Sequence, residues 1–388
     1  MTPAARVSAA IEILDTVLSG QPAEKTLTTW ARRNRFAGSG DRAAIRDLVF
    51  DALRCMRSYG YLGGAQTGRA IMIGALRRAG QEVEAVFDGA RFAPAPLDEA
   101  ERQLPVLAQA PDAVQLDQPD WLVAEFRSSL AGRADDVMRA LQSRAPVFLR
   151  ANLAKTDRET AQDELNKDGI ETKPHSLSDT ALLVTANPRR IQSSRAYLAG
   201  VVELQDAASQ AVVDSLPIQN GMRVLDYCAG GGGKSLAIAA RHTAQVFAHD
   251  IDPARMTDIP ARATRAGAQI TRLQTDALAR KAPYDLILID APCSGSGAWR
   301  RSPEAKWRLT PTKLHEINQL QASILDEASQ LLAPDGILAY ATCSLFASEN
   351  AAQISSFVHR HSQWTLLYDR QFTPLDGGDG FYIAHLKR

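Results

Sequence analysis

The second half of the chain alternates predicted strands with predicted helices, and this pattern restricts the fold more than any other feature. Strands are predicted at residues 223–226, 245–250, 269–275, 285–290 and 337–341. Helices are predicted to begin at Lys234, Pro253 and Pro311, with a further helix near Ser348. Repeated strand–helix units build a mostly parallel sheet with helices on both faces. In such a sheet a ligand binds beyond the carboxyl ends of the strands.

The first 200 residues have a different pattern of predicted secondary structure. Residues 1–140 are predicted to be helical, because apolar residues recur at helical spacing and few β-branched alternations interrupt them. Residues 141–200 are predicted to form a small α/β unit, in which short strands at 147–152 and 181–184 flank a helix at 157–167. We therefore predict three domains, at 1–140, 141–200 and 201–388.

The composition is that of an ordinary soluble globular protein, since 45% of the 388 residues are hydrophobic and 23% are charged. No apolar run is long enough to span a bilayer, and no secretory signal follows Met1, so we expect a cytoplasmic protein without membrane contact. The net charge is zero, so no overall basicity indicates a nucleic-acid partner. The four cysteines lie far apart and no histidine cluster has metal-ligand spacing, which argues against a structural metal or a disulfide framework.

A glycine-rich loop follows the first of these strands, in the sequence Asp226-Tyr227-Cys228-Ala229-Gly230-Gly231-Gly232-Gly233-Lys234-Ser235. Four consecutive glycines between a strand and a helix let the backbone approach a ligand at the helix N-terminus. A phosphate-binding loop would need glycine in place of Cys228, and a dinucleotide-binding fingerprint would need glycine in place of Ser235. A plain tight turn would account for one glycine and not for four.

Acidic residues follow three successive strands, at Asp226, Asp250 and Asp276. An acid at the end of the second strand commonly binds two ribose hydroxyls, and Asp276 could accept hydrogen bonds from an adenine amino group. Each aspartate alone is more often a helix cap or a turn residue. Three of them at successive strand ends favour a cofactor that carries a nucleoside.

Two cysteines follow neighbouring strands, within Asp290-Ala291-Pro292-Cys293 and Thr342-Cys343-Ser344. A lone cysteine is usually a small apolar core residue, but a cysteine just past the carboxyl end of a strand faces the ligand cleft. Methylation of cytosine at carbon 5 is one reaction that needs a thiol, because this carbon is too poor a nucleophile to take a methyl group unaided. A thiolate that adds to carbon 6 of the ring places electron density on carbon 5, which can then accept the methyl group. Asp290 and Lys234 are placed by sequence to act at the base edge, where a proton or hydrogen bond is needed.

Together these residues resemble the RsmB/Nop/Sun family of S-adenosylmethionine-dependent RNA (cytosine-5) methyltransferases. The resemblance covers Val202 to Asn350, nearly half of the chain, through segments at 205–210, 226–235, 290–297, 300–308, 340–344 and 349–350. The stretch Asp379–Tyr382 is similar to the family's final strand. The resemblance implies an α/β fold of the Rossmann-like class I methyltransferase type, with a mixed, mostly parallel seven-stranded sheet. It also implies S-adenosyl-L-methionine as the cofactor.

The resemblance further implies roles for individual residues. Cys343 would be the nucleophile that forms the covalent adduct, and Cys293 would assist product release, either as the base or by orienting one. Lys234 and Asp290 match family positions that contact the target cytosine. The positions expected to bind the cofactor are Asp226, Cys228, Ala229, Gly230, Gly231, Gly232, Gly233, Lys234, Asp250, Arg255, Asp276 and Asp290. No metal site is expected.

The glycine loop departs from the family, which usually has Ala-Ala-Pro-Gly-Gly-Lys where this chain has Ala229-Gly230-Gly231-Gly232-Gly233-Lys234. The loss of the alanine and the proline makes the loop more flexible in the free protein, so we expect weaker preorganisation for the cofactor.

Upstream, the segments 39–42 and 48–54 resemble a helical NusB-like RNA-binding domain. Arg150-Ala151-Asn152 resembles the Arg-x-Asn of the α/β linker domain that precedes the catalytic domain.

Basic residues form three clusters that would suit single-stranded RNA, whose bases stack on aromatic rings. The clusters are Arg32, Arg33, Arg35 and Arg42; Arg189, Arg190 and Arg195; and Arg300, Arg301, Lys306 and Arg308, which alternate with Trp299 and Trp307. Solvated helix faces and core tryptophans explain any one cluster about as well.

We expect a monomer that acts in rRNA processing by forming 5-methylcytosine in a single-stranded or loop region of ribosomal RNA. A transfer RNA substrate and a non-catalytic RNA-binding assembly factor are the alternatives.

Overall fold

The computed structural model describes residues 1–103 and 105–388, which form two compact units. One unit contains residues 1–144 together with 299–308, and the other contains residues 145–298 and 309–388. The division into three domains at residues 140 and 200 stays a prediction. Among the described residues, none of the helices has both the length and the apolar character that crossing a bilayer requires.

The first unit is helical, as the spacing of apolar residues predicts. Its buried core gathers side chains of the first five helices, with Ile13, Leu14, Ile45 and Ile71 among the most buried. Its α-helices are α1 (Pro3–Leu18), α2 (Ala23–Arg33), α3 (Ser39–Arg54), α4 (Met56–Gly63), α5 (Gly68–Arg78), α6 (Asp112–Gln115), α7 (Asp120–Leu130), α8 (Ala134–Ala140) and α15 (Glu304–Arg308). Short 3-10 helices cover Val83–Ala85, Leu107–Gln109 and Ala131–Arg133.

A four-stranded antiparallel sheet opens the second unit, in the order β2-β3-β1-β4. Helix α9 begins after Asp157, whose side chain accepts a hydrogen bond from the backbone N–H of Thr160. The elements of this part are β1 (Phe148–Ala151), α9 (Arg158–Lys167), β2 (Thr172–Pro174), β3 (Ala181–Val184), α10 (Arg195–Leu198) and β4 (Val202–Leu204), with a 3-10 helix at Pro188–Ser193. The small α/β part therefore extends to Leu204 through β4, a strand that the sequence did not predict.

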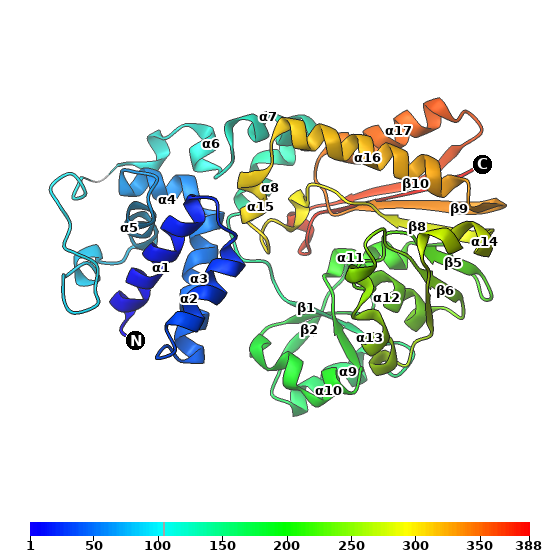
Figure 1. Ribbon diagram of the computed structural model, residues 1–388, viewed down its shortest axis with the longest axis horizontal. Helices are drawn as coiled ribbons and strands as arrows, with labels where there is room; N and C mark the ends of the chain where they lie inside the picture. The colour runs from blue at the N-terminus through cyan, green and yellow to red at the C-terminus, as the bar shows by residue number, and fades with distance from the viewer. Residues whose placement is uncertain (104) are drawn as a thin grey trace. The chain divides into compact units, whose positions relative to one another are not determined.

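A seven-stranded sheet forms the rest of the unit, in the order β10-β11-β9-β8-β5-β6-β7, and confirms the predicted mixed, mostly parallel sheet (Figure 1). Strand β11 runs opposite to the other six strands, so it pairs antiparallel with both β10 and β9, and the remaining pairs are parallel. The strands are β5 (Arg223–Asp226), β6 (Gln245–Ala248), β7 (Ile270–Arg272), β8 (Tyr284–Asp290), β9 (Leu332–Thr342), β10 (Thr365–Phe372) and β11 (Phe381–Lys387). The connecting α-helices are α11 (Ala207–Asp214), α12 (Gly233–Arg241), α13 (Ile259–Ala266), α14 (Leu278–Lys281), α16 (Pro311–Ser329) and α17 (Ala351–Arg360).

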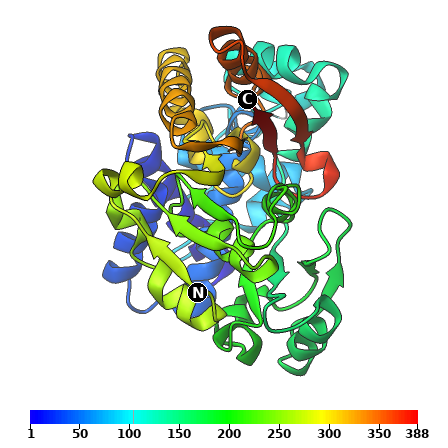
Figure 2. The same cartoon turned by 90° about the vertical axis from the view of Figure 1, so that its right-hand side faces the viewer.

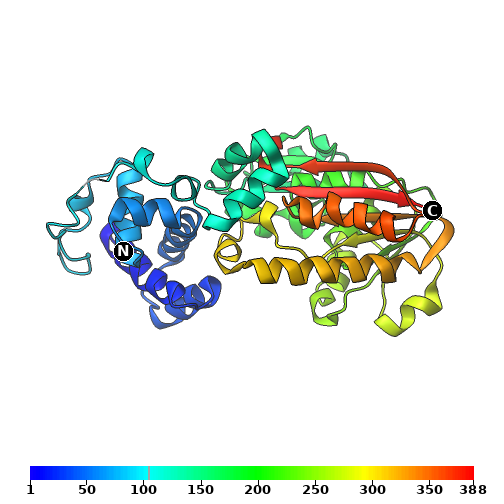
Figure 3. The ribbon, with the colours of Figure 1, turned by 90° about the horizontal axis from the view of Figure 1, so that it is seen from above.

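Both faces of this sheet are covered by helices, because both faces carry apolar side chains. Helices α14, α16 and α17 pack on one face, and α11 and α12 pack on the other. The buried strand β8 shows why, since Leu286 and Leu288 face one layer and Ile287 and Ile289 the other. Figure 2 shows the strands of the sheet between these helices, and Figure 3 shows α16 and α17 side by side.

Besides the unpredicted strands β2 and β4, two details of the larger sheet and its helices differ from the sequence prediction. In place of the one helix predicted to begin at Pro253, the structure has a 3-10 helix at Pro253–Met256 followed by the separate helix α13. Pro260 lies in the first turn of α13, and a proline there starts a helix rather than continuing one, because it has no N–H to donate. Strand β10 was not located, because it lies at the edge of the sheet and most of its side chains are exposed, so no alternation marks it.

Candidate active site

The carboxyl ends of β5, β8 and β9 bring the predicted site residues together. These three strands are parallel neighbours, with Asp226 opposite Leu288 and Asp290 opposite Ala341. Asp226 ends β5, Asp290 ends β8, and Cys343 follows the last residue of β9. The predicted strand-end residues therefore lie along one edge of the sheet, where ligands bind in open α/β sheets.

Lys234 and Asp290 form an ion pair at this edge. The ammonium Nζ of Lys234 lies 2.6 Å from Oδ2 of Asp290, and the Lys234 side chain is 8% exposed. Burial alone would lower the pKa of Lys234, but the charge of Asp290 and its hydrogen bond outweigh burial and raise that pKa above its ordinary value. Lys234 thus stays charged and can donate a proton or a hydrogen bond at the strand ends.

Cys293 and Cys343 lie in direct contact, with their Sγ atoms 3.3 Å apart, and both are free, partly exposed thiols. The contact with the Cys343 thiol, and next to it burial, raise the pKa of Cys293 well above its ordinary value. The backbone N–H of Gly297 donates to the carbonyl oxygen of Cys343 at 2.9 Å, which ties the loop after β8 to the loop after β9. Two thiols this close, next to a charged lysine, are an arrangement suited to covalent catalysis.

The glycine loop turns sharply between β5 and α12. Gly230 and Gly232 have φ values of 51° and 77°, which side chains with a Cβ rarely adopt. The backbone N–H of Gly230 donates to Oδ2 of Asp250 at 3.0 Å, so the end of β6 holds the loop after β5. Arg255 pairs with the same oxygen of Asp250 at 3.0 Å, although its own side chain is 58% exposed.

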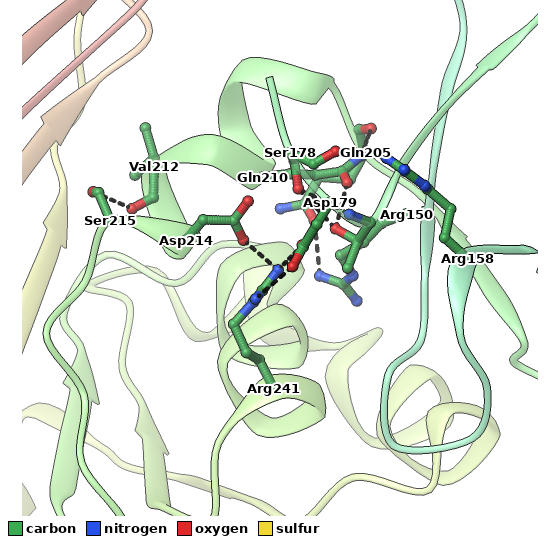
Figure 4. A network of polar contacts seen from close by, with 11 residues as sticks. Arg150, Arg158, Ser178, Asp179, Gln205, Gln210, Val212, Asp214, Ser215 and Arg241 are labelled. Atoms are coloured by element: carbon green, nitrogen blue, oxygen red, sulfur yellow. Dashed lines mark hydrogen bonds and ion pairs between the residues drawn. The ribbon is translucent and has the colours of Figure 1, made fainter. Parts of the chain in front are cut away.

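Side chains from outside the loop hold its carbonyl groups. Arg150 of β1 donates to the carbonyl oxygen of Gly233 at 3.1 Å and to Oε1 of Gln205 at 2.7 Å. Arg262 of α13 donates to the carbonyl oxygen of Gly231. Figure 4 shows Arg150 with Gln205 in a wider polar network that also contains Asp179, Asp214 and Arg241. These contacts oppose the loop flexibility that the missing proline predicts.

Asp226 carries the feature that best fits a bound cofactor. The residue is buried, its Oδ2 accepts a hydrogen bond from Oγ of Ser235 at 2.6 Å, and its Oδ1 has no hydrogen-bond partner among the described residues. A buried acceptor of this kind can be satisfied by a donor on a ligand. Burial raises the pKa of Asp226 to about 7, although the Ser235 hydroxyl lowers it. The residues present therefore fit a ligand bound at the glycine loop.

Two further predicted cofactor positions, Asp276 and Cys228, differ in their burial. Asp276 lies in a 3-10 helix (Thr275–Ala277) after β7, and its exposed side chain pairs with Arg280. The Cys228 thiol is largely buried, and burial together with the charges of Asp290 and Asp226 raises its pKa. The structure thus brings Asp226, Lys234, Asp290, Cys293 and Cys343 together, but it does not bring Asp276 into their contacts.

The cluster around Trp299 and Trp307 is mostly core rather than an exposed RNA-binding surface. Trp299, Arg300 and Lys306 are each at most 5% exposed. The Lys306 ammonium donates to the backbone carbonyl oxygens of Arg54 and Asp117, and burial lowers its pKa to about 8. These residues complete the helical unit, so the interpretation as an RNA-binding patch is wrong for them. Arg301 and Arg308 are exposed, as are the arginines of the other two clusters.

The sheet order, with functional side chains along the strand ends, defines a Rossmann-like methyltransferase fold. Residues 213–387 match the family described as 16S rRNA methyltransferase RsmB/F, and residues 118–191 match the ferredoxin-like domain of RsmF/B-like methyltransferases. The chain belongs to the RsmB/F methyltransferase family.

Individual relatives agree with this assignment. The ribosomal RNA small subunit methyltransferase B of Yersinia pseudotuberculosis serotype O:1b is 33% identical over 290 residues, which cover 69% of this chain and 66% of the relative. The chain thus spans about two thirds of the length of that relative. The crystal structure of PH0851 is similar in fold over 100% of this chain and 99% of its own, with a TM-score of 0.77 at 23% identity. NSun6 from Pyrococcus horikoshii, solved with SFG, covers 69% of this chain and 98% of its own, with a TM-score of 0.62 at 17% identity.

Proposed function

We propose that this protein transfers a methyl group from S-adenosylmethionine to carbon 5 of a cytosine in ribosomal RNA. The observation that carries the proposal is the contact of 3.3 Å between the Cys293 and Cys343 thiols at neighbouring strand ends, beside the Lys234–Asp290 ion pair. A nucleophilic thiol, a second thiol and a charged donor are the groups that methylation of an unreactive ring carbon needs.

Cys343 acts first in the proposed mechanism. Its thiolate adds to carbon 6 of cytosine, a sulfur–carbon bond forms, and the electron pair of the ring double bond moves toward carbon 5. Lys234, held by Asp290 at 2.6 Å, donates a hydrogen bond or proton at the base edge as negative charge develops there. S-adenosylmethionine, when bound, supplies the methyl group as an electrophile on a sulfonium.

Cys293 acts in the second half of the mechanism. After carbon 5 has gained the methyl group, its proton must leave, the ring double bond re-forms and the bond from carbon 6 to Cys343 breaks. Cys293 lies in contact with Cys343 and assists this release, either as the base or by orienting one. Cys293→Ala is therefore expected to accumulate the covalent protein–RNA adduct.

The cofactor is proposed to bind at the glycine loop. The buried Oδ1 of Asp226 would accept a hydrogen bond from it, the backbone of Gly230 to Gly233 would lie against it, and Asp250 would bind its ribose hydroxyls. Arg255 pairs with Asp250 in the structure, and its exposed side chain can move aside when the ribose binds. The naming of a Yersinia relative as a ribosomal RNA small subunit methyltransferase supports the substrate class. Monomeric state and a cytoplasmic location stay predictions.

The test combines a transfer assay with mapping of the modified base. Purified protein is incubated with S-adenosylmethionine labelled in its methyl group and with unmodified ribosomal RNA, and bisulfite sequencing then locates the protected cytosine. Wild type is expected to protect a cytosine, whereas Cys343→Ala is expected to transfer no label.

Four outcomes would contradict parts of the proposal. Transfer by Cys343→Ala would exclude that residue as the nucleophile, and an adduct trapped in Cys343→Ala instead of Cys293→Ala would reverse the two roles. Label that enters transfer RNA and not ribosomal RNA would replace the substrate. Binding of RNA without binding of S-adenosylmethionine in a calorimeter would exclude a methyltransferase.

A further inference from the structure

Glu349 is a fully buried carboxylate whose exposed fraction is 0%, and the proposed mechanism gives it no role. It lies in a 3-10 helix (Ala347–Glu349) shortly after the loop that carries Cys343. A buried carboxylate is costly unless hydrogen bonds satisfy it, so its partners should explain why it is there.

The carboxylate of Glu349 joins the two loops that carry the thiols. Its Oε1 accepts a hydrogen bond from the backbone N–H of Ser294 at 2.7 Å, and its Oε2 accepts hydrogen bonds from the Ser294 and Ser344 hydroxyls. Ser294 directly follows Cys293, and Ser344 directly follows Cys343. One side chain thus binds the residue after each cysteine.

Further contacts hold both the carboxylate and the backbone of Glu349. Gln321 of α16 donates to Oε1 of Glu349 at 3.2 Å and to the carbonyl oxygen of Pro292 at 2.9 Å. The Tyr340 hydroxyl donates to the backbone carbonyl oxygen of Glu349 at 2.8 Å. Among the described residues, the hydrogen-bond donors to the carboxylate are all neutral, so its negative charge is solvated by hydrogen bonds.

We propose that Glu349 is a positioning residue that holds the Cys293 and Cys343 thiols in contact and confines the thiolate to Cys343. This inference rests on the proposed function, because it explains why one of two adjacent thiols attacks and the other does not. Without such a constraint, two thiols in contact would share the negative charge, and either could become the nucleophile.

The charged and titratable groups around the pair support this division. On the side of Cys293 stand Glu349 and Tyr340, and the charge of Glu349 adds to the contact with Cys343 and to burial in raising the pKa of Cys293. On the side of Cys343 stands Lys234, with which Cys343 interacts electrostatically, together with Asp290. The negative charge of Glu349 beside Cys293 therefore disfavours a thiolate on Cys293.

Thiol alkylation in the free protein tests the proposal without RNA or cofactor. Wild type, Glu349→Gln and the control Glu327→Gln are treated with iodoacetamide from pH 6 to pH 10, and mass spectrometry measures the alkylation rate of each cysteine. Glu327 is an exposed glutamate that accepts a hydrogen bond from the Tyr227 hydroxyl. Glu349→Gln keeps the shape of the side chain and removes its charge.

The expected result is a change in which thiol reacts. Wild type and Glu327→Gln should alkylate Cys343 in preference to Cys293, and Glu349→Gln should raise the rate at Cys293 severalfold, because removal of the Glu349 charge lowers the pKa of Cys293 and raises its thiolate fraction. An unchanged ratio of the two rates in a folded Glu349→Gln protein would overturn the proposal, since a merely structural residue would not alter the ratio.

A second variant covers the case in which Glu349→Gln does not fold. Glu349→Asp keeps the charge and shortens the side chain, so the preference for Cys343 should survive in it, and loss of that preference would overturn the proposal. Failure of the proposed function would be seen separately, as absence of methyl transfer by wild type, because alkylation needs neither substrate.

Discussion

The glycine loop and the two thiol loops form the two halves of the candidate active site, and they are held in place by different means. The glycine loop offers backbone carbonyl oxygens, and separate arginines bind them: Arg150 at Gly233 and Arg262 at Gly231. The thiol loops instead depend on one buried acceptor, Glu349, to which both donate.

This difference predicts how each half responds to substitution. When several separate donors hold a loop, each substitution removes one hydrogen bond, and each bond contributes about 1 kcal/mol to the free energy of unfolding. Loss of the carboxylate that the thiol loops share removes three of their hydrogen bonds at once and leaves three donors of Ser294 and Ser344 without that acceptor, although the Gly297 N–H still donates to the Cys343 carbonyl oxygen. The Glu349 variants measure the response of the thiol loops, and four predictions for the glycine loop and its neighbours, from the largest expected effect to the smallest, measure the response of the other half.

Lys234→Met should have the largest effect, because Lys234 belongs to α12 after the glycine loop and pairs with Asp290 beside the thiols. Loss of a hydrogen-bond or proton donor at the reacting base should lower the rate of methyl transfer by about 10²- to 10⁴-fold. Lys155→Met is the control, since Lys155 is exposed and donates to the backbone carbonyls of Ala199 and Arg265. Single-turnover rates close to wild type in Lys234→Met would show that the two halves work without this link.

Asp226 should make stability depend on pH in an unusual direction. Its pKa is about 7 in the folded protein, against 3.8 ordinarily, so between these values the unfolded chain releases a proton that the folded protein keeps. Stability should therefore fall as pH rises from about 4 to about 7, by on the order of 3 kcal/mol, relative to Asp226→Asn. Urea unfolding of both proteins across this range measures the difference, and parallel curves would contradict the prediction.

Arg150→Met should weaken cofactor binding about tenfold, or about 1.4 kcal/mol, because the loop at Gly233 loses a charged donor. The matched control is Arg158→Met, since Arg158 donates to the carbonyl oxygen of Ser178 and not to the loop (Figure 4). Calorimetry with S-adenosylmethionine compares the two variants. Equal affinities would mean that Arg262 and Gln205 suffice to hold the loop.

Two adjacent glycines should respond in opposite directions. At Gly232 φ is 77° and an added Cβ would lie 2.8 Å from Cγ1 of Ile259, so Gly232→Ala should lose about 1 to 2 kcal/mol of stability. At Gly233 the nearest atom to an added Cβ is Nε2 of Gln205, at 3.9 Å, and Gly233→Ala should gain about 0.4 to 1 kcal/mol. Denaturant midpoints measure both variants, and equal shifts would indicate that the loop relaxes freely.

The meeting of the site residues at one edge of the sheet could be predicted, because parallel neighbours place their carboxyl ends together. Asp226, Asp290 and Cys343 each end or follow a strand with a continuous apolar run, so their places depend on local sequence alone. The contact between the two thiols follows from the pairing of β8 with β9, which the strand–helix alternation makes probable but does not specify.

The supports of the site could not be predicted, because they join residues far apart in sequence. Arg150 reaches a loop 83 residues further on, and Glu349 binds Ser294 from 55 residues away. A buried arginine and a buried glutamate look like surface residues in a sequence, since such side chains are mostly exposed. The same expectation led to the incorrect interpretation of Lys306 and Arg300 as RNA contacts.

The burial of Trp299 and Lys306 in the helical unit has a consequence for how the chain is made. Residues 1–144 leave the ribosome before residues 299–308, which belong to the same compact unit and whose Trp299 packs against Phe126. At a synthesis rate of about 5 to 20 residues per second, residues 299–308 are made roughly 10 to 30 seconds after residues 1–144. During that time the surface that will receive Trp299 is open to chaperones and proteases, so the order of synthesis favours completing much of the sheet before the helical unit closes.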